Sequence, residues 1–239
     1  MISFIIPTLN EEKLLPTLLK QLFSGEVDSS HFEVIISDGG STDGTLQIAE
    51  TFPVRVVKNN NEPENIPIGK NRGAKISSGD ILVFITADIV FDNLKLFIET
   101  VHTKLKEKTV ALTFPVKVIA NERRLSDIVF HGFYNRYFRF INLIGIGFGR
   151  GECQVIKRDT FNELNGFREF LFAGEDFDLF LRAGKVGKIK YCNNSIIYES
   201  PRRYRKIGYL GIIKLWTRNA LSVLQNKDSS FSKKWEPIR

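Results

Sequence analysis

The stretch VIISDGGSTDGT, residues 34–45, decides the fold that we expect for this chain. The apolar segment FEVIIS (32–37) has the composition of a buried strand. It ends on a carboxylate, Asp38, followed directly by Gly39 and Gly40. Glycines allow the backbone to come close to a ligand, and ligands of open parallel sheets bind beyond the carboxyl ends of the strands. The stretch therefore predicts a ligand loop at the end of a parallel strand.

Strands and helices alternate along the first half of the chain, outward from this stretch. Apolar segments at 2–7, 32–37, 54–59, 80–88 and 110–118 predict strands, and segments at 10–25, 43–52, 68–79 and 92–107 predict helices. Strands joined by helices of this length lie parallel in one sheet. We therefore expect an α/β fold, with a mostly parallel central sheet flanked by helices.

Three polar loops should open on one edge of this sheet. They begin after the first, second and fourth strands, at Pro7–Glu11, Asp38–Ser41 and Thr86–Asp88. A carboxylate there can accept a hydrogen bond from a base or a ribose hydroxyl, or bind a metal. Asp38 and Asp43 can also be simple turn and cap residues; for Asp38 the convergence of three loops favours a ligand. The chain lacks the G-x-G-x-x-G and P-loop phosphate motifs.

Composition limits the classes of protein to which the chain can belong. A chain of 239 residues with 43% hydrophobic residues suits one α/β domain or at most two small ones. Two cysteines are too few for a disulfide scaffold or a zinc site, which favours a cytoplasmic setting. The N-terminal residues predict a strand and not a signal peptide, and no transmembrane helix is expected. Residues 200–239 contain 10 basic and 2 acidic residues, within a total net charge of +7, so we expect an anionic partner there.

Aromatic residues gather in a predicted helix at 128–149. Phe130, Phe133, Tyr134, Tyr137, Phe138 and Ile141 form one stripe at helical spacing, and Arg136 and Arg139 lie between them. Such a stripe usually packs in the core. It also suits a helix at a membrane interface, where the arginines would meet lipid phosphates. The basic, apolar segment 202–224 allows the same two interpretations: a packed helix or a membrane surface.

Four segments, in this order, resemble the family-2 glycosyltransferases of the GT-A fold: FIIPTLNEE, ISDGGSTDGT, GKNRGAKISSGDILVFITAD and AGEDFDLFLRAGKVGKI. The resemblance runs from residue 2 to about residue 205, and SPRRYRKIG (200–208) is similar to a subgroup with a Ser-x-Arg-Arg segment. It implies a donor half at 1–118, an acceptor half at 119–205, and a basic amphipathic helix and tail at 206–239. It also implies an inverting transfer of a sugar from a UDP- or GDP-sugar to a lipid-linked or glycan acceptor.

The resemblance also implies roles for individual residues. Asp176 would be the general base, with Glu175 beside it, and Asp88 would bind a divalent Mg²⁺ or Mn²⁺ ion. The donor nucleotide would contact Pro7, Asn10, Glu11, Asp38, Lys70 and Asp88. The diphosphate or the acceptor would contact Arg202, Arg203 and Glu152, although an ion pair with Arg150 explains Glu152 equally well.

The chain departs from the family pattern at the fourth strand. The usual Asp-x-Asp is Thr86-Ala87-Asp88 here, so the first acid is missing. Metal dependence is therefore open, and Arg202 and Arg203 can share the stabilisation of the leaving diphosphate. A non-catalytic protein that binds nucleotide sugars or anionic glycans is the alternative function. No nucleic-acid motif accompanies the basic tail, and a cytoplasmic place, free or peripheral on the membrane face, is expected.

Overall fold

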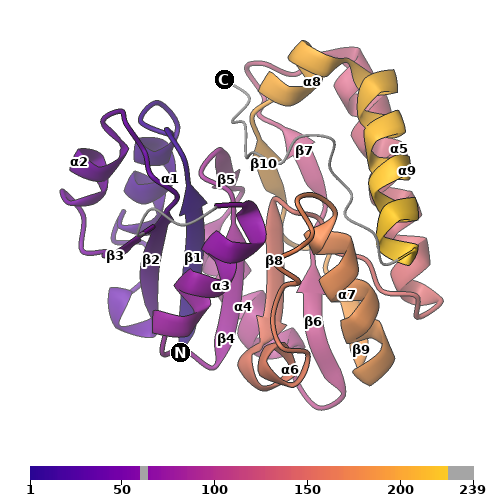
Figure 1. Ribbon diagram of the computed structural model, residues 1–239, viewed down its shortest axis with the longest axis horizontal. Helices are drawn as coiled ribbons and strands as arrows, with labels where there is room; N and C mark the ends of the chain where they lie inside the picture. Colours follow the sequence, from indigo (N-terminus) through magenta and orange to yellow (C-terminus); the bar gives the residue numbers. More distant parts are fainter. Residues whose placement is uncertain (60–63, 226–239) are drawn as a thin grey trace.

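The central element of the protein is a twisted, mostly parallel sheet of seven strands, seen in a computed structural model that describes residues 1–59 and 64–225 (Figure 1). The sheet order is β3 (Arg55–Lys58), β2 (Phe32–Asp38), β1 (Ile2–Thr8), β4 (Ile81–Ile85), β8 (Cys153–Lys157), β6 (Thr109–Thr113) and β9 (Lys188–Tyr191). Only β8 runs antiparallel to its neighbours, β4 and β6. The predicted α/β fold is confirmed, and β1, β2 and β4 end on the same edge.

A second, small sheet stands beside the carboxyl edge of the first. It pairs β5 (Ile89–Phe91), β10 (Ile197–Glu199) and β7 (Val116–Val118). The single strand predicted at 110–118 was therefore wrong. It divides at Phe114 and Pro115 into β6, in the large sheet, and β7, in the small one. Proline cannot donate to a strand ladder, so a break at this point is expected.

Helices cover both faces of the large sheet. On one face the apolar core joins α1 (Leu15–Leu22) and α4 (Leu94–Lys104) to the sheet, with the short α2 (Thr45–Ala49) beside α1. On the other face a second apolar cluster joins α3 (Ile66–Ile76), α6 (Arg158–Glu163) and α7 (Glu175–Val186) to the sheet. Figure 1 shows α3 and α7 lying across the near face of the sheet. The predicted helices at 10–25 and 43–52 exist but are shorter at both ends.

A separate helical layer flanks the small sheet. It consists of α5 (Leu125–Leu143), α8 (Arg202–Ile207) and α9 (Tyr209–Leu224), which share a small apolar cluster around Phe130 and Ile212. The helix predicted at 128–149 thus begins earlier and ends at Leu143. The helical segment 202–224 is broken at Gly208, whose φ of 76° lies in the left-handed region. Residues 226–239 of the predicted tail lie outside the described residues. Among the described helices, none is both long and apolar enough to cross a membrane.

Candidate active site

The Asp38 loop is built around the carboxylate at its start. The side chain of Asp38 is buried, with 1% exposed, and one oxygen accepts hydrogen bonds from the backbone N–H groups of Gly40 (3.0 Å) and Ser41 (2.9 Å). The other oxygen accepts from the hydroxyls of Thr8 and Ser41. Both oxygens of Asp38 therefore fix the loop that follows β2, and the expected contact with a nucleobase stays a prediction.

The loop after β1 is tied to this loop by Asn10. Asn10 has a φ of 58°, a left-handed conformation that asparagine tolerates better than most residues. Its side-chain oxygen accepts from the backbone N–H groups of Thr42 (2.7 Å) and Asp43 (3.2 Å). The conformation of one loop therefore holds the other, and Pro7, buried in β1, opposes Ser37 in the parallel register just before them.

Arg202 connects the third loop to the first. Its guanidinium forms two parallel hydrogen bonds with the carboxylate of Glu11, at 3.0 and 2.8 Å. Its Nε lies 3.2 Å from Oδ2 of Asp88. This bidentate pairing is the geometry that arginine offers to carboxylates and phosphates. The structure thus brings together three residues that the sequence analysis proposed for the same site, although 191 positions separate Glu11 from Arg202.

A buried ion pair lies under the opposite side of the site. The ammonium group of Lys70 donates to Oε1 of Glu175 at 2.9 Å and to Oε1 of Gln154 at 3.0 Å. The side chains of Lys70 and Glu175 are 2% and 9% exposed, and the ammonium lies 4.8 Å from the ring centre of Phe167. Lys70 was expected near the donor phosphates. Here its charge is engaged with Glu175, an interaction that no local sequence pattern indicated.

Asp176 follows Glu175 at the beginning of α7 and is only partly exposed. Burial, and then the negative charge of Glu175, raise the pKa of Asp176 to about 7, and the charge of Lys70 opposes this rise. One of its oxygens accepts from the backbone N–H of Phe177 at 2.8 Å. The other faces Gly151, where a β-carbon would lie 3.1 Å away. A carboxyl group with a pKa near neutrality can accept a proton under physiological conditions.

A second charged network, centred on Arg150, joins β8 to β10 and α8. Arg150 is 4% exposed and pairs with Glu152 at 3.1 Å and Glu199 at 3.0 Å, and the hydroxyl of Tyr204 donates to Glu199 at 2.8 Å. Burial raises the pKa of Glu199 well above its ordinary value, and the charge of Glu152 adds to this rise. Burial would also raise the pKa of Glu152, but Arg150 holds it at about 2. The charge of the exposed Arg203 acts on Glu152 in the same direction.

This network contains residues to which the sequence analysis gave no function. It expected the ion pair between Arg150 and Glu152 as one alternative. Glu199 and Tyr204 were not among the residues that it proposed. An acid in the final strand, followed five residues later by tyrosine, carries no recognisable local signal. The contact exists because β10 and α8 bring Glu199 and Tyr204 to the buried side chain of Arg150.

The fit of a metal ion to this site rests on Asp88. Only Oδ2 of Asp88 is engaged by Arg202, and the buried hydroxyl of Thr86 makes no hydrogen bond within residues 1–59 and 64–225. In the same part of the chain, no cluster of three or more His, Cys, Asp or Glu side chains could hold a metal. Mg²⁺ usually takes one or two carboxylates, with phosphate oxygens and water as its other ligands. The residues therefore fit a single metal contact at Asp88.

Comparison with known proteins identifies the family. The sequence profile of glycosyl transferase family 2 matches residues 3–164. A PGL/p-HBAD biosynthesis glycosyltransferase of Mycobacterium bovis is 36% identical over 92 residues, which cover 37% of this chain and 35% of that protein. A 4,4'-diaponeurosporenoate glycosyltransferase of Staphylococcus haemolyticus is 40% identical over 99 residues, covering 38% and 25%. The match thus spans about a third or less of these relatives' length.

Among solved structures, the mannosyltransferase PcManGT from Pyrobaculum calidifontis, in complex with GDP-Man and Mn²⁺, is similar in fold. It has a TM-score of 0.72 and 18% identity, and the similarity covers 96% of this chain and 65% of that one. Since the family profile covers more than half of the sequence and the GT-A fold agrees with it, the chain belongs to glycosyl transferase family 2.

Proposed function

We propose that this chain transfers a sugar from a nucleotide-diphosphate donor to a lipid-linked or glycan acceptor, with inversion at the anomeric carbon. Asp176 carries the proposal, because it is a carboxyl group with a pKa of about 7 in the first turn of α7, facing Gly151. A general base with such a pKa accelerates proton transfer by about 10²–10⁴-fold. Membership of the family supports the reaction class, and the GDP-Man complex of the mannosyltransferase supports the donor class.

In the proposed reaction, Asp176 accepts the proton of the acceptor hydroxyl. The acceptor oxygen then forms a bond to the anomeric carbon, and the bond from that carbon to the diphosphate oxygen breaks. The electron pair leaves with the diphosphate, where negative charge accumulates. Arg202 and Arg203 would stabilise that charge, because guanidinium groups bind phosphate oxygens in pairs. Glu175 holds Lys70 and raises the pKa of its neighbour Asp176.

The donor would lie over the three loops at the ends of β1, β2 and β4, in the proposed donor half, residues 1–118. Asp38 and Asn10 would shape the nucleotide pocket, and Pro7 would line it. Glu11 would act on the pocket indirectly, by holding the guanidinium of Arg202. Glu152 belongs to the proposed acceptor half, residues 119–205, where it would contact the diphosphate or the acceptor. A Mg²⁺ or Mn²⁺ ion would bind Asp88 and supply positive charge to the diphosphate, sharing that role with the arginines.

The test combines binding and turnover. UDP, GDP and their sugars are titrated with and without Mn²⁺, and a ligand of the native state must raise the melting temperature. Transfer to candidate acceptors is then followed by NMR, which reports the configuration of the new bond. Retention of configuration would overturn the proposed inversion. Asp176→Asn tests the acceptor class, since an acceptor phosphate is already anionic and would show little loss of rate.

One observation favours the alternative, a non-catalytic protein that binds nucleotide sugars or anionic glycans. Thr86 replaces the first acid of the strand-end motif, and Arg202 already pairs with the remaining acid, Asp88. A protein of that kind would bind a nucleotide sugar without hydrolysing or transferring it in the presence of any acceptor. In that case Asp176→Asn would leave the affinity for the donor unchanged. No sugar transfer would be detected with the wild-type chain or with any variant.

A further inference from the structure

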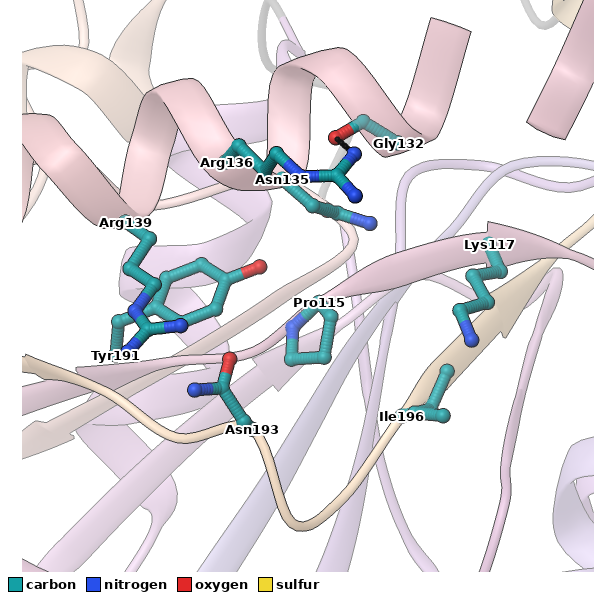
Figure 2. A pocket seen from close by; sticks show the side chains of 9 residues that line it. All are labelled: Pro115, Lys117, Gly132, Asn135, Arg136, Arg139, Tyr191, Asn193 and Ile196. Carbon is teal, nitrogen blue, oxygen red and sulfur yellow. Dashed lines mark hydrogen bonds between the residues drawn. The ribbon is translucent and has the colours of Figure 1, made fainter. Parts of the chain in front are cut away.

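A basic pocket lies between α5 and the small sheet, and none of its lining residues belongs to the candidate active site. Its volume is about 290 Å³, and it is bounded by α5, β7 and the segment that joins β9 to β10. Figure 2 shows Arg139 directed from α5 towards Tyr191 and Asn193, and Lys117 directed from β7 towards Ile196 at the other side of the pocket. The lining includes three cationic side chains, Lys117, Arg136 and Arg139, and no acid.

The cations of this pocket have no carboxylate partner within residues 1–59 and 64–225. The guanidinium of Arg136 donates to the backbone carbonyl of Gly132 at 3.1 Å, and neither Lys117 nor Arg139 forms an ion pair in that part of the chain. The contrast with the active site is clear, since the arginines at positions 150, 202 and 205 all pair with carboxylates. Unpaired positive charges around a cavity favour an anionic ligand.

Tyr191 adds a hydrogen-bond donor to this pocket. Its hydroxyl oxygen is buried and has no hydrogen-bond partner among the described residues. Burial raises the pKa of Tyr191 to about 12, so the hydroxyl keeps its proton at neutral pH. A buried polar group without a partner costs free energy, and native proteins usually satisfy such groups. An anion in the pocket would accept this hydrogen bond.

The outer face of α5, beside the pocket, is apolar. Five residues along it are strongly exposed: Leu125 (76%), Val129 (65%), Phe133 (63%), Phe140 (57%) and Leu143 (82%). Their spacing of three, four and seven residues places them on one side of the helix. Arg136 lies at the same spacing on that side. The aromatic stripe predicted from the sequence is thus divided. Phe130 is buried in the cluster with α8 and α9, and Phe138 is buried with its ring stacked on Phe148, while Phe133 and Tyr137 remain exposed.

We propose that the outer face of α5 lies in the interface of an anionic lipid bilayer and that the basic pocket receives the phosphate of a lipid headgroup. A helix with one exposed apolar side and flanking cations lies in the plane of a membrane, buried by about 5–10 Å. Charge complementarity favours anionic lipid over a second copy of the chain, because the positively charged pockets of two copies would repel each other. The proposal is independent of the transferase reaction, since it concerns binding alone.

The test is co-sedimentation of the whole chain with vesicles of phosphatidylglycerol and phosphatidylcholine, compared with vesicles of phosphatidylcholine alone. We expect binding to the anionic vesicles only. Each cation near an anionic surface contributes about fivefold to affinity. Arg136→Gln with Arg139→Gln should therefore weaken binding by about 25-fold. Lys20→Gln with Lys95→Gln removes the same charge from α1 and α4 and should change binding by less than about threefold.

Tyr191→Phe tests the pocket separately from the apolar face. The hydroxyl has no partner to lose in the free protein, so the melting temperature should not fall. Affinity for the anionic vesicles should fall about tenfold, the usual effect of losing a hydrogen bond to a charged group. Phe133→Ser with Phe140→Ser should weaken binding to the same vesicles, because it removes apolar area from the membrane side.

Results of three kinds would overturn the proposal: one from the wild-type chain, two from the variants and one from self-association. The first is equal binding of the wild-type chain to neutral and anionic vesicles. The second is a loss of binding in the Lys20 and Lys95 control as large as in the Arg136 and Arg139 variant, or wild-type affinity in Tyr191→Phe. The third is concentration-dependent dimerisation, seen by light scattering and abolished by Phe133→Ser, without vesicle binding. That last result would assign the α5 face to a second copy of the chain.

Discussion

Removal of the Lys70 ammonium should destabilise the protein strongly, and removal of its partner charge should reverse most of the loss. Lys70 and Glu175 are 2% and 9% exposed and lie 2.9 Å apart. Loss of one member of a buried pair leaves an uncompensated charge and costs about 3–5 kcal/mol. Lys70→Met should therefore lower the free energy of unfolding by this amount. At about 2.1 cal/mol/K per residue over the 239 residues, the melting temperature should fall by roughly 6–10 °C.

The double variant Lys70→Met, Glu175→Gln removes both charges. A buried pair replaced by neutral groups of similar volume is often close to neutral in stability. The remaining loss should be the contact of the ammonium with Phe167, about 0.5–2 kcal/mol, and the lost donor to Gln154. We expect the double variant to recover about 2–3 kcal/mol relative to Lys70→Met.

The assay is a double-mutant cycle by urea unfolding, with calorimetry as a second measure of melting temperature. Glu175→Gln alone completes the cycle. The reasoning would be refuted by additive losses, in which the double variant is less stable than Lys70→Met by the full cost of Glu175→Gln. Additivity would mean that the two groups do not stabilise each other across the 2.9 Å contact.

Four further predictions concern Asp176, Tyr204 and Gly166. Asp176 has a pKa of about 7, so the transfer rate should rise between about pH 6 and pH 8, and Asp176→Asn should flatten this profile. Because folding raises that pKa, the native state binds the extra proton. Wild-type stability, measured in urea, should therefore fall as pH increases from about 4 to 7, and less so in Asp176→Asn. Tyr204→Phe should cost about 1–3 kcal/mol in the same assay, because buried Glu199 loses its 2.8 Å donor. Gly166→Ala should destabilise more than Gly25→Ala: both have positive φ, but only at Gly166 would a β-carbon meet an atom, at 2.7 Å.

The large sheet was predictable because its signal is local. The strands at 2–7 and 32–37 are apolar runs that end on polar loops, and a parallel arrangement follows from the helices between them. The small sheet was not predictable in this way. It joins residues 89–91, 116–118 and 197–199, and the pairing of β5 with β10 spans more than a hundred positions. Strands of three residues carry too short a pattern to be distinguished from loops.

The candidate site was also predictable only where local sequence signals indicate it. Motifs indicated which side chains gather at the edge of the sheet, and Glu11, Asp88 and Arg202 do meet there. Motifs did not indicate how their charges are paired. The family resemblance implied that Lys70 lies at the donor nucleotide, yet its partner Glu175 comes from a helix 105 positions later. The pairing of buried charges depends on which elements pack together in the folded chain, so sequence motifs alone do not predict it.

The pairing of Arg202 has a chemical consequence for the donor edge. Two carboxylates, Glu11 and Asp88, pair with its guanidinium and hold it between the first and third loops. A diphosphate would offer the same guanidinium acceptors of higher charge in the same bidentate geometry. Release of Asp88 from Arg202 would then leave its carboxylate available to a divalent ion. Under the proposed function, Arg202 would thus supply positive charge beside the phosphates, in a site where Thr86 stands in place of the usual first acid.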